Sequence, residues 1–362
     1  MIEAMRPPIP TSLDEIDAAW LTRALQRKYP GVNVGRIDVD TIVHGAGTKV
    51  RFNVVFERNA NPPLNTTVWL KAGWEPHSEW LAQTSRIYAR EAWFYRDLQP
   101  PIAINAPQAF YADFDDRGRG IVVLEDLIQR RATLNDCTVA ASAEQIHRSL
   151  DALARLHAYQ WDNAFLDATP LIDLPMRVDH PSSEWPRRNG PEVIAKFLAT
   201  ARGAEVPPEV NDPERIDRAF WVHIDHMARD RPHCLIHGDP HPGNGFVDAD
   251  GSPGFFDWQT IAKGPWAFDV AYHIVSSMDV EERRRSERAL LQHYLGRLRA
   301  YGVGAPPSFD EAWLQYRRYI AYGLHIWISN PVHFQAEENC KALVTRLSIA
   351  AADLKFFDAW GV

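Results

Sequence analysis

The stretch that decides the fold reads His237-Gly238-Asp239-Pro240-His241-Pro242-Gly243-Asn244, and Phe255-Phe256-Asp257-Trp258 follows it closely. Two prolines and two glycines make the first part a sharply turned loop and disfavour a helix. A carboxylate can accept the proton of an attacking hydroxyl, and Mg²⁺ prefers oxygen ligands from carboxylates and carboxamides. The segment therefore predicts phosphoryl transfer with magnesium, a reaction in which positioning and charge neutralisation carry most of the catalysis.

The spacing of the polar residues supports this chemistry. Asp239 and Asn244 have the offset of the Asp and Asn in the H-R-D-x-x-x-x-N catalytic loop of protein kinases. Asp257 stands where those kinases carry the metal-binding Asp of D-F-G. A third block, Gly264-Pro265-Trp266-Ala267-Phe268-Asp269, comes shortly afterwards.

The three blocks, in this order and at this spacing, resemble the aminoglycoside phosphotransferase and choline kinase group. The match is nearest to its ecdysteroid-kinase-like small-molecule kinases. The resemblance implies that Asp239 is the catalytic base, that Asn244 and Asp257 are metal ligands, and that Asp269 braces the catalytic loop. It also implies ATP and Mg²⁺ as cofactors.

Composition limits the class of protein. The chain has 362 residues, 46% of them hydrophobic and 24% charged, which suits a folded soluble protein of roughly two domains. No apolar stretch approaches the ~20 residues that span a bilayer, and the first ten residues lack the apolar core of a signal peptide. Three widely spaced cysteines favour a reducing cytoplasm. The net charge of −8 argues against a nucleic-acid partner; it is compatible with a cationic substrate or simply with solvated acidic faces.

The N-terminal part alternates between strand and helix patterns. Ser12 and Glu15 form a capping-box pattern at the start of a helix expected over 11–29. The pattern then predicts strands at 37–43, 50–56 and 66–72, a helix over 78–98, and strands at 109–113 and 120–124. This order matches the N-terminal lobe of a protein-kinase-like fold. We therefore expect an α+β, two-lobed chain, with a nucleotide-binding lobe over 1–127 and a catalytic and substrate-binding lobe over 128–362.

The second lobe is expected to be mostly helical. Apolar periodicity predicts helices over 142–161, 280–302, 308–328 and 334–359, and a proline-rich loop over 203–213. Short apolar pieces at 234–236, 245–247 and 255–256 are expected to form one small sheet around the catalytic loop.

The resemblance also places nucleotide-binding residues in the first lobe. Lys71 ends the third strand and would meet the α- and β-phosphates of ATP, paired with Glu91 from the following helix. The alternative is a surface Lys and Glu that make no contact. Gly45 and Gly47 would let the hairpin close over the phosphates through the backbone of Ala46, Gly47 and Thr48, although Val50 departs from the fuller G-x-G-x-x-G pattern.

The fifth strand ends in Leu124-Glu125-Asp126-Leu127, where the lobes are expected to join. By resemblance, the backbone around Glu125 and Leu127 would bind the adenine edge, and Asp126 would not face the purine. Any strand that ends before a loop has a similar pattern. The segment therefore either binds adenine or is an ordinary connection between the lobes.

Two further patterns have competing explanations. His233, His237 and His241 recur every four residues, but prolines disfavour the helix that a zinc site of this spacing needs, so we expect His237 to buttress the loop. The chain has 13 tryptophans, and five lie where an acceptor would bind: Trp161, Trp185, Trp221, Trp313 and Trp327. They indicate a bulky, partly apolar acceptor, or else ordinary core packing.

The sequence therefore predicts an ATP-dependent kinase of a small-molecule hydroxyl. One alternative is an aminoglycoside or macrolide antibiotic kinase, although no acidic cluster near the C-terminus resembles an aminoglycoside cradle. Another is a nucleotide-binding protein without catalysis. A protein kinase is also conceivable, but the chain lacks the A-P-E segment and a recognisable activation loop. The acceptor and the oligomeric state stay open.

Overall fold

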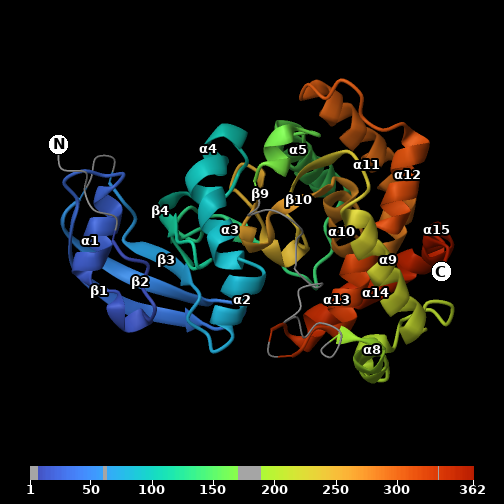
Figure 1. Ribbon diagram of the computed structural model, residues 1–362, viewed down its shortest axis with the longest axis horizontal. Coiled ribbons are helices and arrows are strands. Elements are labelled where there is room, and N and C mark those ends of the chain that lie inside the picture. The colour runs from blue at the N-terminus through green and yellow to red at the C-terminus, as the bar shows by residue number, and fades with distance from the viewer. Residues whose placement is uncertain (1–6, 60–62, 170–188, 333) are drawn as a thin grey trace. The chain divides into compact units, whose positions relative to one another are not determined.

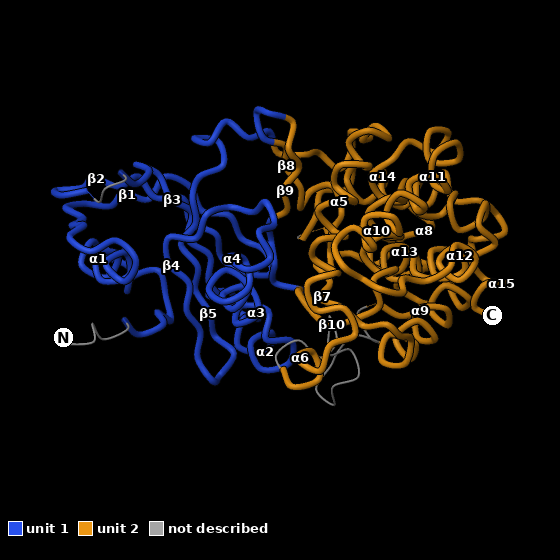
Figure 2. The backbone as a smooth tube through the Cα atoms, turned by 90° about the horizontal axis from the view of Figure 1, so that it is seen from above, with its two compact units in different colours: residues 1–133, 248–250, 256–260 blue, residues 134–247, 251–255, 261–362 orange. Residues whose placement is uncertain are grey.

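The computed structural model describes residues 7–59, 63–169, 189–332 and 334–362. The chain forms two compact units (Figure 2): unit 1 comprises residues 1–133, 248–250 and 256–260, and unit 2 comprises residues 134–247, 251–255 and 261–362. Unit 1 thus ends a few residues after the division expected at 127 and 128. It also includes the short segment that carries Asp257, which sequence reasoning assigned to the second lobe.

Unit 1 is built on an antiparallel sheet (Figure 1), whose five strands have the order β1-β2-β3-β5-β4. All five predicted strands are present, and β1 and β2 are longer than expected. Alternate residues of β2, among them Val50, Phe52 and Val54, are buried in a core that also takes residues of helix α1. The strands are β1 (Asn33–Val43), β2 (Thr48–Arg58), β3 (Thr67–Ala72), β4 (Ala109–Phe114) and β5 (Gly120–Glu125).

The first helix, α1 (Ala18–Gln26), is shorter than the helix expected over 11–29. Asp17 caps it by accepting a hydrogen bond from the Trp20 amide at 2.6 Å. Ser12 precedes only a 3-10 turn, Leu13–Glu15, and its side chain caps nothing. The predicted capping box is wrong because the Glu15 carboxylate bonds to Thr11 instead.

The prediction of a single helix over 78–98 is also wrong. The segment forms α2 (Ser78–Thr84) and α3 (Ile87–Trp93), followed by a π-helical turn, Phe94–Leu98, and α4 (Gln99–Ile102). Arg86 separates α2 from α3 with a left-handed φ of 53°. Helix α3 packs against β4 and β5 and against the 3-10 turn Trp258–Thr260, where the rings of Phe94 and Trp258 stack 3.8 Å apart.

Unit 2 is mainly helical, and none of the described helices is both long and apolar enough to cross a membrane. Helix α5 (Ala143–Tyr159) starts at a capping box made by Ser142 and Gln145, close to the predicted start, and packs against α11 (Val280–Ala300). The other helices are α6 (Ala164–Asp167), α8 (Pro191–Leu198), α9 (Pro213–Met227), α10 (Ala267–Ser277), α12 (Phe309–Arg318), α13 (Ala321–Ser329), α14 (Glu337–Asp353) and α15 (Phe356–Trp360).

Two of the predicted C-terminal helices are each divided in two. The helix expected over 308–328 is interrupted between α12 and α13, and the one over 334–359 is interrupted between α14 and α15, where Lys355 takes a φ of 50°. Every residue of α10 is buried, so this helix has no polar face for sequence periodicity to reveal.

The short strands of unit 2 do not form the single sheet that was expected. Strand β7 (His233–Ile236) pairs with β10 (Ala262–Pro265), and β8 (Gly245–Val247) pairs with β9 (Pro253–Phe255). A further short strand, β6, covers Thr133–Leu134. The loop from His237 to Asn244 runs from β7 to β8 and is therefore fixed at both ends.

Candidate active site

The loop from His237 to Asn244, predicted to be catalytic, is held by the carboxylate of Asp269, in the first turn of α10. Its Oδ2 accepts the His237 amide at 2.6 Å, and its Oδ1 accepts the Gly238 amide at 3.0 Å. Gly238 has a φ of 84°, a left-handed conformation that favours glycine. Asp269 thus braces the loop, as expected from the resemblance.

His157 on α5 fixes Asp269 in turn. Its Nε2 lies 3.1 Å from Asp269 Oδ2, and its Nδ1 lies 2.7 Å from the Tyr294 hydroxyl. Burial raises the pKa of Tyr294 well above its ordinary value, so the phenol stays protonated and donates to Nδ1. Nε2 then carries the hydrogen and donates to the carboxylate. Three hydrogen-bond donors therefore converge on one fully buried carboxylate.

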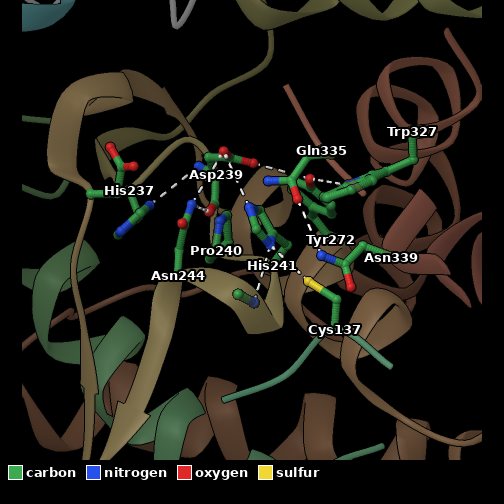
Figure 3. A network of polar contacts seen from close by, with 12 residues as sticks. Cys137, His237, Asp239, Pro240, His241, Asn244, Tyr272, Trp327, Gln335 and Asn339 are labelled. Atoms are coloured by element: carbon green, nitrogen blue, oxygen red, sulfur yellow. Dashed lines mark hydrogen bonds and ion pairs between the residues drawn. The ribbon is translucent and has the colours of Figure 1, made fainter. Parts of the chain in front are cut away.

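Asp239 lies between two donors, Asn244 on one side and Tyr272 on the other (Figure 3). Asn244 Nδ2 donates to the Asp239 backbone oxygen at 2.8 Å and to Oδ2 at 3.2 Å. Because both of these partners are acceptors only, the amide nitrogen of Asn244 must face Asp239, and its Oδ1 faces away. The side chain thereby presents an oxygen that suits a hard cation such as Mg²⁺.

The second donor to Asp239 belongs to a chain of two aromatic side chains. Trp327 Nε1 on α13 donates to the Tyr272 hydroxyl at 2.5 Å, and that hydroxyl lies 3.0 Å from Asp239 Oδ1. Burial raises the pKa of Tyr272 well above its ordinary value, so the phenol keeps its proton. An indole N–H can only donate, and therefore the hydroxyl donates its own proton to Asp239. Sequence reasoning missed Tyr272, although it follows Asp269 by three residues, a spacing that places both on one face of a helix.

His241 borders the same carboxylate. Its Nδ1 accepts the Gly243 amide at 3.1 Å, so Nε2 carries the hydrogen, and Nε2 lies 3.6 Å from Asp239 Oδ2. The other two histidines of the repeat also bond to the backbone. His233 Nε2 lies 3.0 Å from Met227 O, and His237 Nδ1 accepts the Asp239 amide at 3.3 Å. His237 thus buttresses the loop as expected. Across the described ranges, no three His, Cys, Asp or Glu side chains are grouped to hold a metal.

In unit 1, Lys71 on β3 is buried between two carboxylates. Its Nζ lies 2.7 Å from Glu91 Oε2 and 2.6 Å from Asp257 Oδ1, so the predicted Lys–Glu ion pair is present. Lys49 lies 3.3 Å from the other oxygen of Asp257. Burial lowers the pKa of Lys71, but the charges of Asp257 and Glu91 outweigh burial and raise it. Burial raises the pKa of Asp257, but Lys71 and Lys49 outweigh it and hold the pKa well below its usual range.

Asp257 has a strained backbone. Its φ of 62° lies in the left-handed region, which costs a non-glycine residue of order 1–3 kcal/mol. The stacked Trp258 ring and the two lysines hold it there. Such strain is commonly found at functional positions.

The other predicted nucleotide-binding residues lie at two ends of the same sheet. Gly45, Ala46, Gly47 and Thr48 connect β1 to β2, as predicted. Glu125 ends β5, and its side chain accepts hydrogen bonds from the Gln108 amide and Arg130.

The residues after Glu125 are engaged within unit 1. The Leu127 carbonyl accepts the Ala132 amide at 3.0 Å. Asp126 is turned inward to Arg51 and Thr67, so its carboxylate does not face a purine site, in line with the sequence-based expectation. Adenine binding at the backbone of Glu125 and Leu127 stays a prediction.

The four described tryptophans that were expected around the acceptor have different surroundings. Trp327 bonds to Tyr272 and packs against His241, whereas Trp313 packs on α12 beside Phe309, Tyr316 and Arg288. Trp221 lies against Phe220 on α9, Trp161 follows the end of α5, and Trp185 lies outside the described residues. Of the four that the structure describes, Trp327 is the one that it connects to Asp239, through Tyr272.

Comparison with known proteins identifies the family. The chain belongs to the phosphotransferase enzyme family, whose model matches residues 65–307. This match confirms the predicted aminoglycoside phosphotransferase and choline kinase superfamily. A comparison with curated proteins found none that matches this chain in sequence.

Solved structures of kinases share the fold. An ethanolamine kinase from Plasmodium vivax matches with a TM-score of 0.51 at 12% identity, covering 91% of this chain and 87% of that one. A spectinomycin phosphotransferase, solved with ADP and spectinomycin, matches with a TM-score of 0.50 at 14% identity, covering 94% and 99%. A choline kinase from Streptococcus pneumoniae has a TM-score of 0.46 at 14% identity, covering 88% and 94%. The first two of these matches, with TM-scores of 0.51 and 0.50, confirm the two-lobed, protein-kinase-like α+β fold predicted from the sequence.

Proposed function

We propose that this phosphotransferase moves the γ-phosphoryl group of ATP to a hydroxyl of a small molecule, with Mg²⁺ as cofactor. The observation that carries the proposal is the buried ammonium of Lys71, fixed between the carboxylates of Glu91 and Asp257. A buried Lys–carboxylate cluster is costly unless every member is paired. Its position at the strand end beside the Gly45–Thr48 turn suits a role in binding phosphate oxygens.

The oxygen donors are suited to a magnesium ion. Asn244 Oδ1 and the Asp257 carboxylate would hold Mg²⁺, which when bound neutralises charge on the phosphates. Asp257 stays ionised because Lys71 and Lys49 lower its pKa, and an ionised carboxylate is the form that ligates a hard cation. Glu91 keeps Lys71 oriented through the second half of the ion pair.

Asp239 is proposed to orient and deprotonate the acceptor hydroxyl. Tyr272 and Asn244 each donate one hydrogen bond to a different oxygen of its carboxylate, which fixes the carboxylate plane. A carboxylate has about four acceptor positions, so these two hydrogen bonds do not by themselves occupy all of them. A base held in this way needs little reorganisation when the hydroxyl arrives.

The acceptor is proposed to be a bulky, partly apolar alcohol. Its support is the set of planar rings beside Asp239, namely Tyr272, His241 and Trp327. Aromatic rings provide large apolar contacts, and a cation can also bind over their faces. An aminoglycoside or macrolide kinase is the rival within the same reaction class, and antibiotic susceptibility of cells that express the protein would distinguish it.

The test is an acceptor panel assayed for ADP release and for a product heavier by one phosphate. The panel should contain compact sugars, amino alcohols, aminoglycosides, macrolides and apolar alcohols, with Asp239→Asn as the inactive control. We expect transfer to an apolar alcohol that needs Mg²⁺ and is lost in the control. Transfer only to compact polyhydroxylated sugars would overturn the acceptor class. Tight ATP binding without transfer to any acceptor would favour a non-catalytic nucleotide-binding protein.

A further inference from the structure

Two side chains from outside the β1–β2 turn hold two successive carbonyls of that turn. His77 Nε2 lies 3.0 Å from Gly45 O, and the Tyr88 hydroxyl donates to Ala46 O at 2.5 Å. A carbonyl can only accept, so His77 Nε2 carries a hydrogen. Burial raises the pKa of Tyr88 to about 12, so its hydroxyl stays protonated and donates.

These two contacts determine where the N–H groups of the turn point. The peptides of the turn are trans, and a trans peptide is planar, with its C=O and N–H on opposite sides. The Gly45 carbonyl shares its peptide with the Ala46 N–H, and the Ala46 carbonyl shares its peptide with the Gly47 N–H. Both N–H groups therefore point away from His77 and Tyr88. In the described part of the chain, no backbone oxygen accepts either of them.

We propose that His77 and Tyr88 are positioning residues that aim the N–H groups of Ala46 and Gly47 at the phosphates of the bound nucleotide. Backbone N–H groups that converge in a turn form an anion-binding concavity. The inference rests on the proposed function, because it takes a nucleotide as the ligand of unit 1. It adds two side chains that do not themselves contact the nucleotide.

Glu75 holds both ends of the same turn. Its Oε1 accepts the Thr48 hydroxyl at 2.6 Å and lies 2.9 Å from His44 Nδ1. Burial raises the pKa of Glu75, but the hydrogen bonds from Thr48 and His44 outweigh burial and lower it, so the carboxylate stays charged. Glu75 follows Lys71 by four residues along the chain, so the segment that supplies the phosphate-binding lysine also fixes the turn.

Helix α3 joins the two phosphate-binding elements. Tyr88 and Glu91 are three residues apart and share a face of the helix. Glu91 holds Lys71, and Tyr88 holds the turn. The Tyr88 ring also accounts for a glycine at position 47: a Cβ there would lie 3.0 Å from Tyr88 Cε1 and 3.0 Å from Ala72 O, whereas the nearest atom to a Cβ at Gly45 is 3.9 Å away.

The test compares the binding of MgATP with that of adenosine, which lacks phosphates, by isothermal titration calorimetry. Tyr88→Phe keeps the ring and removes the hydroxyl. We expect it to weaken MgATP binding about two- to tenfold, the equivalent of one hydrogen bond, and to leave adenosine binding unchanged. His77→Ala should have the same selective effect. Tyr111→Phe is the matched control, because it removes a buried hydroxyl bonded to Asp113 elsewhere in the sheet.

A second pair of variants keeps the inference testable if a side-chain variant folds poorly. Gly47→Ala should weaken MgATP selectively because the new Cβ presses on Tyr88, and Gly304→Ala, where a Cβ would meet nothing within 4 Å, should bind like the wild type. Wild-type MgATP affinity in Tyr88→Phe, or an equal loss of adenosine, would overturn the inference. A wild-type protein that binds neither ligand would instead overturn the proposed function, and the inference with it.

Discussion

Replacing Asp269 with alanine should strongly destabilise the protein, because the catalytic loop depends on this one carboxylate. The backbone amides of His237 and Gly238 and the ring of His157 all donate to it, and the side chain is fully buried. Removing a partner from a buried donor costs about 1–3 kcal/mol. With three donors, and allowing for partial relaxation, we expect Asp269→Ala to lower the free energy of unfolding by about 3–6 kcal/mol.

Asp269→Asn separates charge and geometry from simple loss of volume. The carboxamide keeps one acceptor oxygen but turns an NH₂ group toward at least one of the three donors. We expect an intermediate loss of about 2–3 kcal/mol. Asp212→Ala is the matched control in the same unit, since Asp212 caps α9 by accepting a single backbone amide, and loss of such a cap costs about 1 kcal/mol.

The measurement is urea-induced unfolding followed by far-UV circular dichroism, with the slope on denaturant compared between variants. The expected order of destabilisation is Asp269→Ala, then Asp269→Asn, then Asp212→Ala. If Asp269→Ala costs no more than Asp212→Ala, the loop is not held by this carboxylate and the reasoning fails.

Three shorter predictions concern the same unit. Asp239→Asn should reduce turnover roughly 10²–10⁴-fold while MgATP affinity in calorimetry stays near wild type; full turnover on a real acceptor would show that another group is the base. Tyr272→Phe should reduce kcat about tenfold without raising KM for ATP, because it removes the hydroxyl that bonds to Asp239. The control is Tyr319→Phe, whose hydroxyl bonds to Asp230 and whose kcat should not fall. Equal kinetics in both variants would contradict the positioning of Asp239. Burial lowers the pKa of His273 from 6.5 to about 4, so the unfolded state takes up a proton first and stability falls as pH drops from about 6.5 to 4. The free energy of unfolding in urea, measured at pH 7.5 and at pH 4, should fall by roughly 3 kcal/mol less in His273→Gln than in the wild type. An unchanged pH dependence would argue against a neutral buried ring.

The parts of the site that local sequence specifies were predictable. The loop from His237 to Asn244 carries its own turn residues, so its shape follows from glycine and proline chemistry. Lys71 and Glu91 lie on a strand and on the following helix, and the resemblance supplied their pairing, which the structure confirms at 2.7 Å. The brace at Asp269 was found in the same way.

The breaks in the helices could not be read from periodicity. Arg86 takes a left-handed conformation without any glycine or proline nearby to signal it, and the residues on both sides have ordinary helix-forming character. The reason is tertiary: α3 must pack on β4 and β5 and bring Glu91 to Lys71, which a straight continuation of α2 would not do. Packing of this kind overrides local propensity.

The positioning residues escaped sequence reasoning for a different reason. Trp327 reaches Tyr272 across 55 positions of the chain, and Tyr88 reaches Ala46 across 42. An aromatic residue in a helix is usually read as core, and both tyrosines are indeed buried. What distinguishes them is the partner of the hydroxyl, because a buried phenol must find an acceptor, and here the acceptors belong to the segments proposed to act on the acceptor hydroxyl and to bind the nucleotide.

The two carboxylates that hold Lys71 have different surroundings, and this difference fits a nucleotide-binding role. Glu91 comes from the buried face of α3 and its side chain is 3% exposed, whereas Asp257 is 12% exposed and is shared with Lys49. The two lysines and two carboxylates balance in formal charge. A phosphate that enters this cluster adds negative charge and competes with Asp257 for Lys71. Within the cluster, Glu91 accepts its hydrogen bond from Lys71, and the charge of Lys49 acts on it more weakly. Glu91 is therefore suited to orient the lysine permanently, and Asp257 to exchange its lysine contact for another cation.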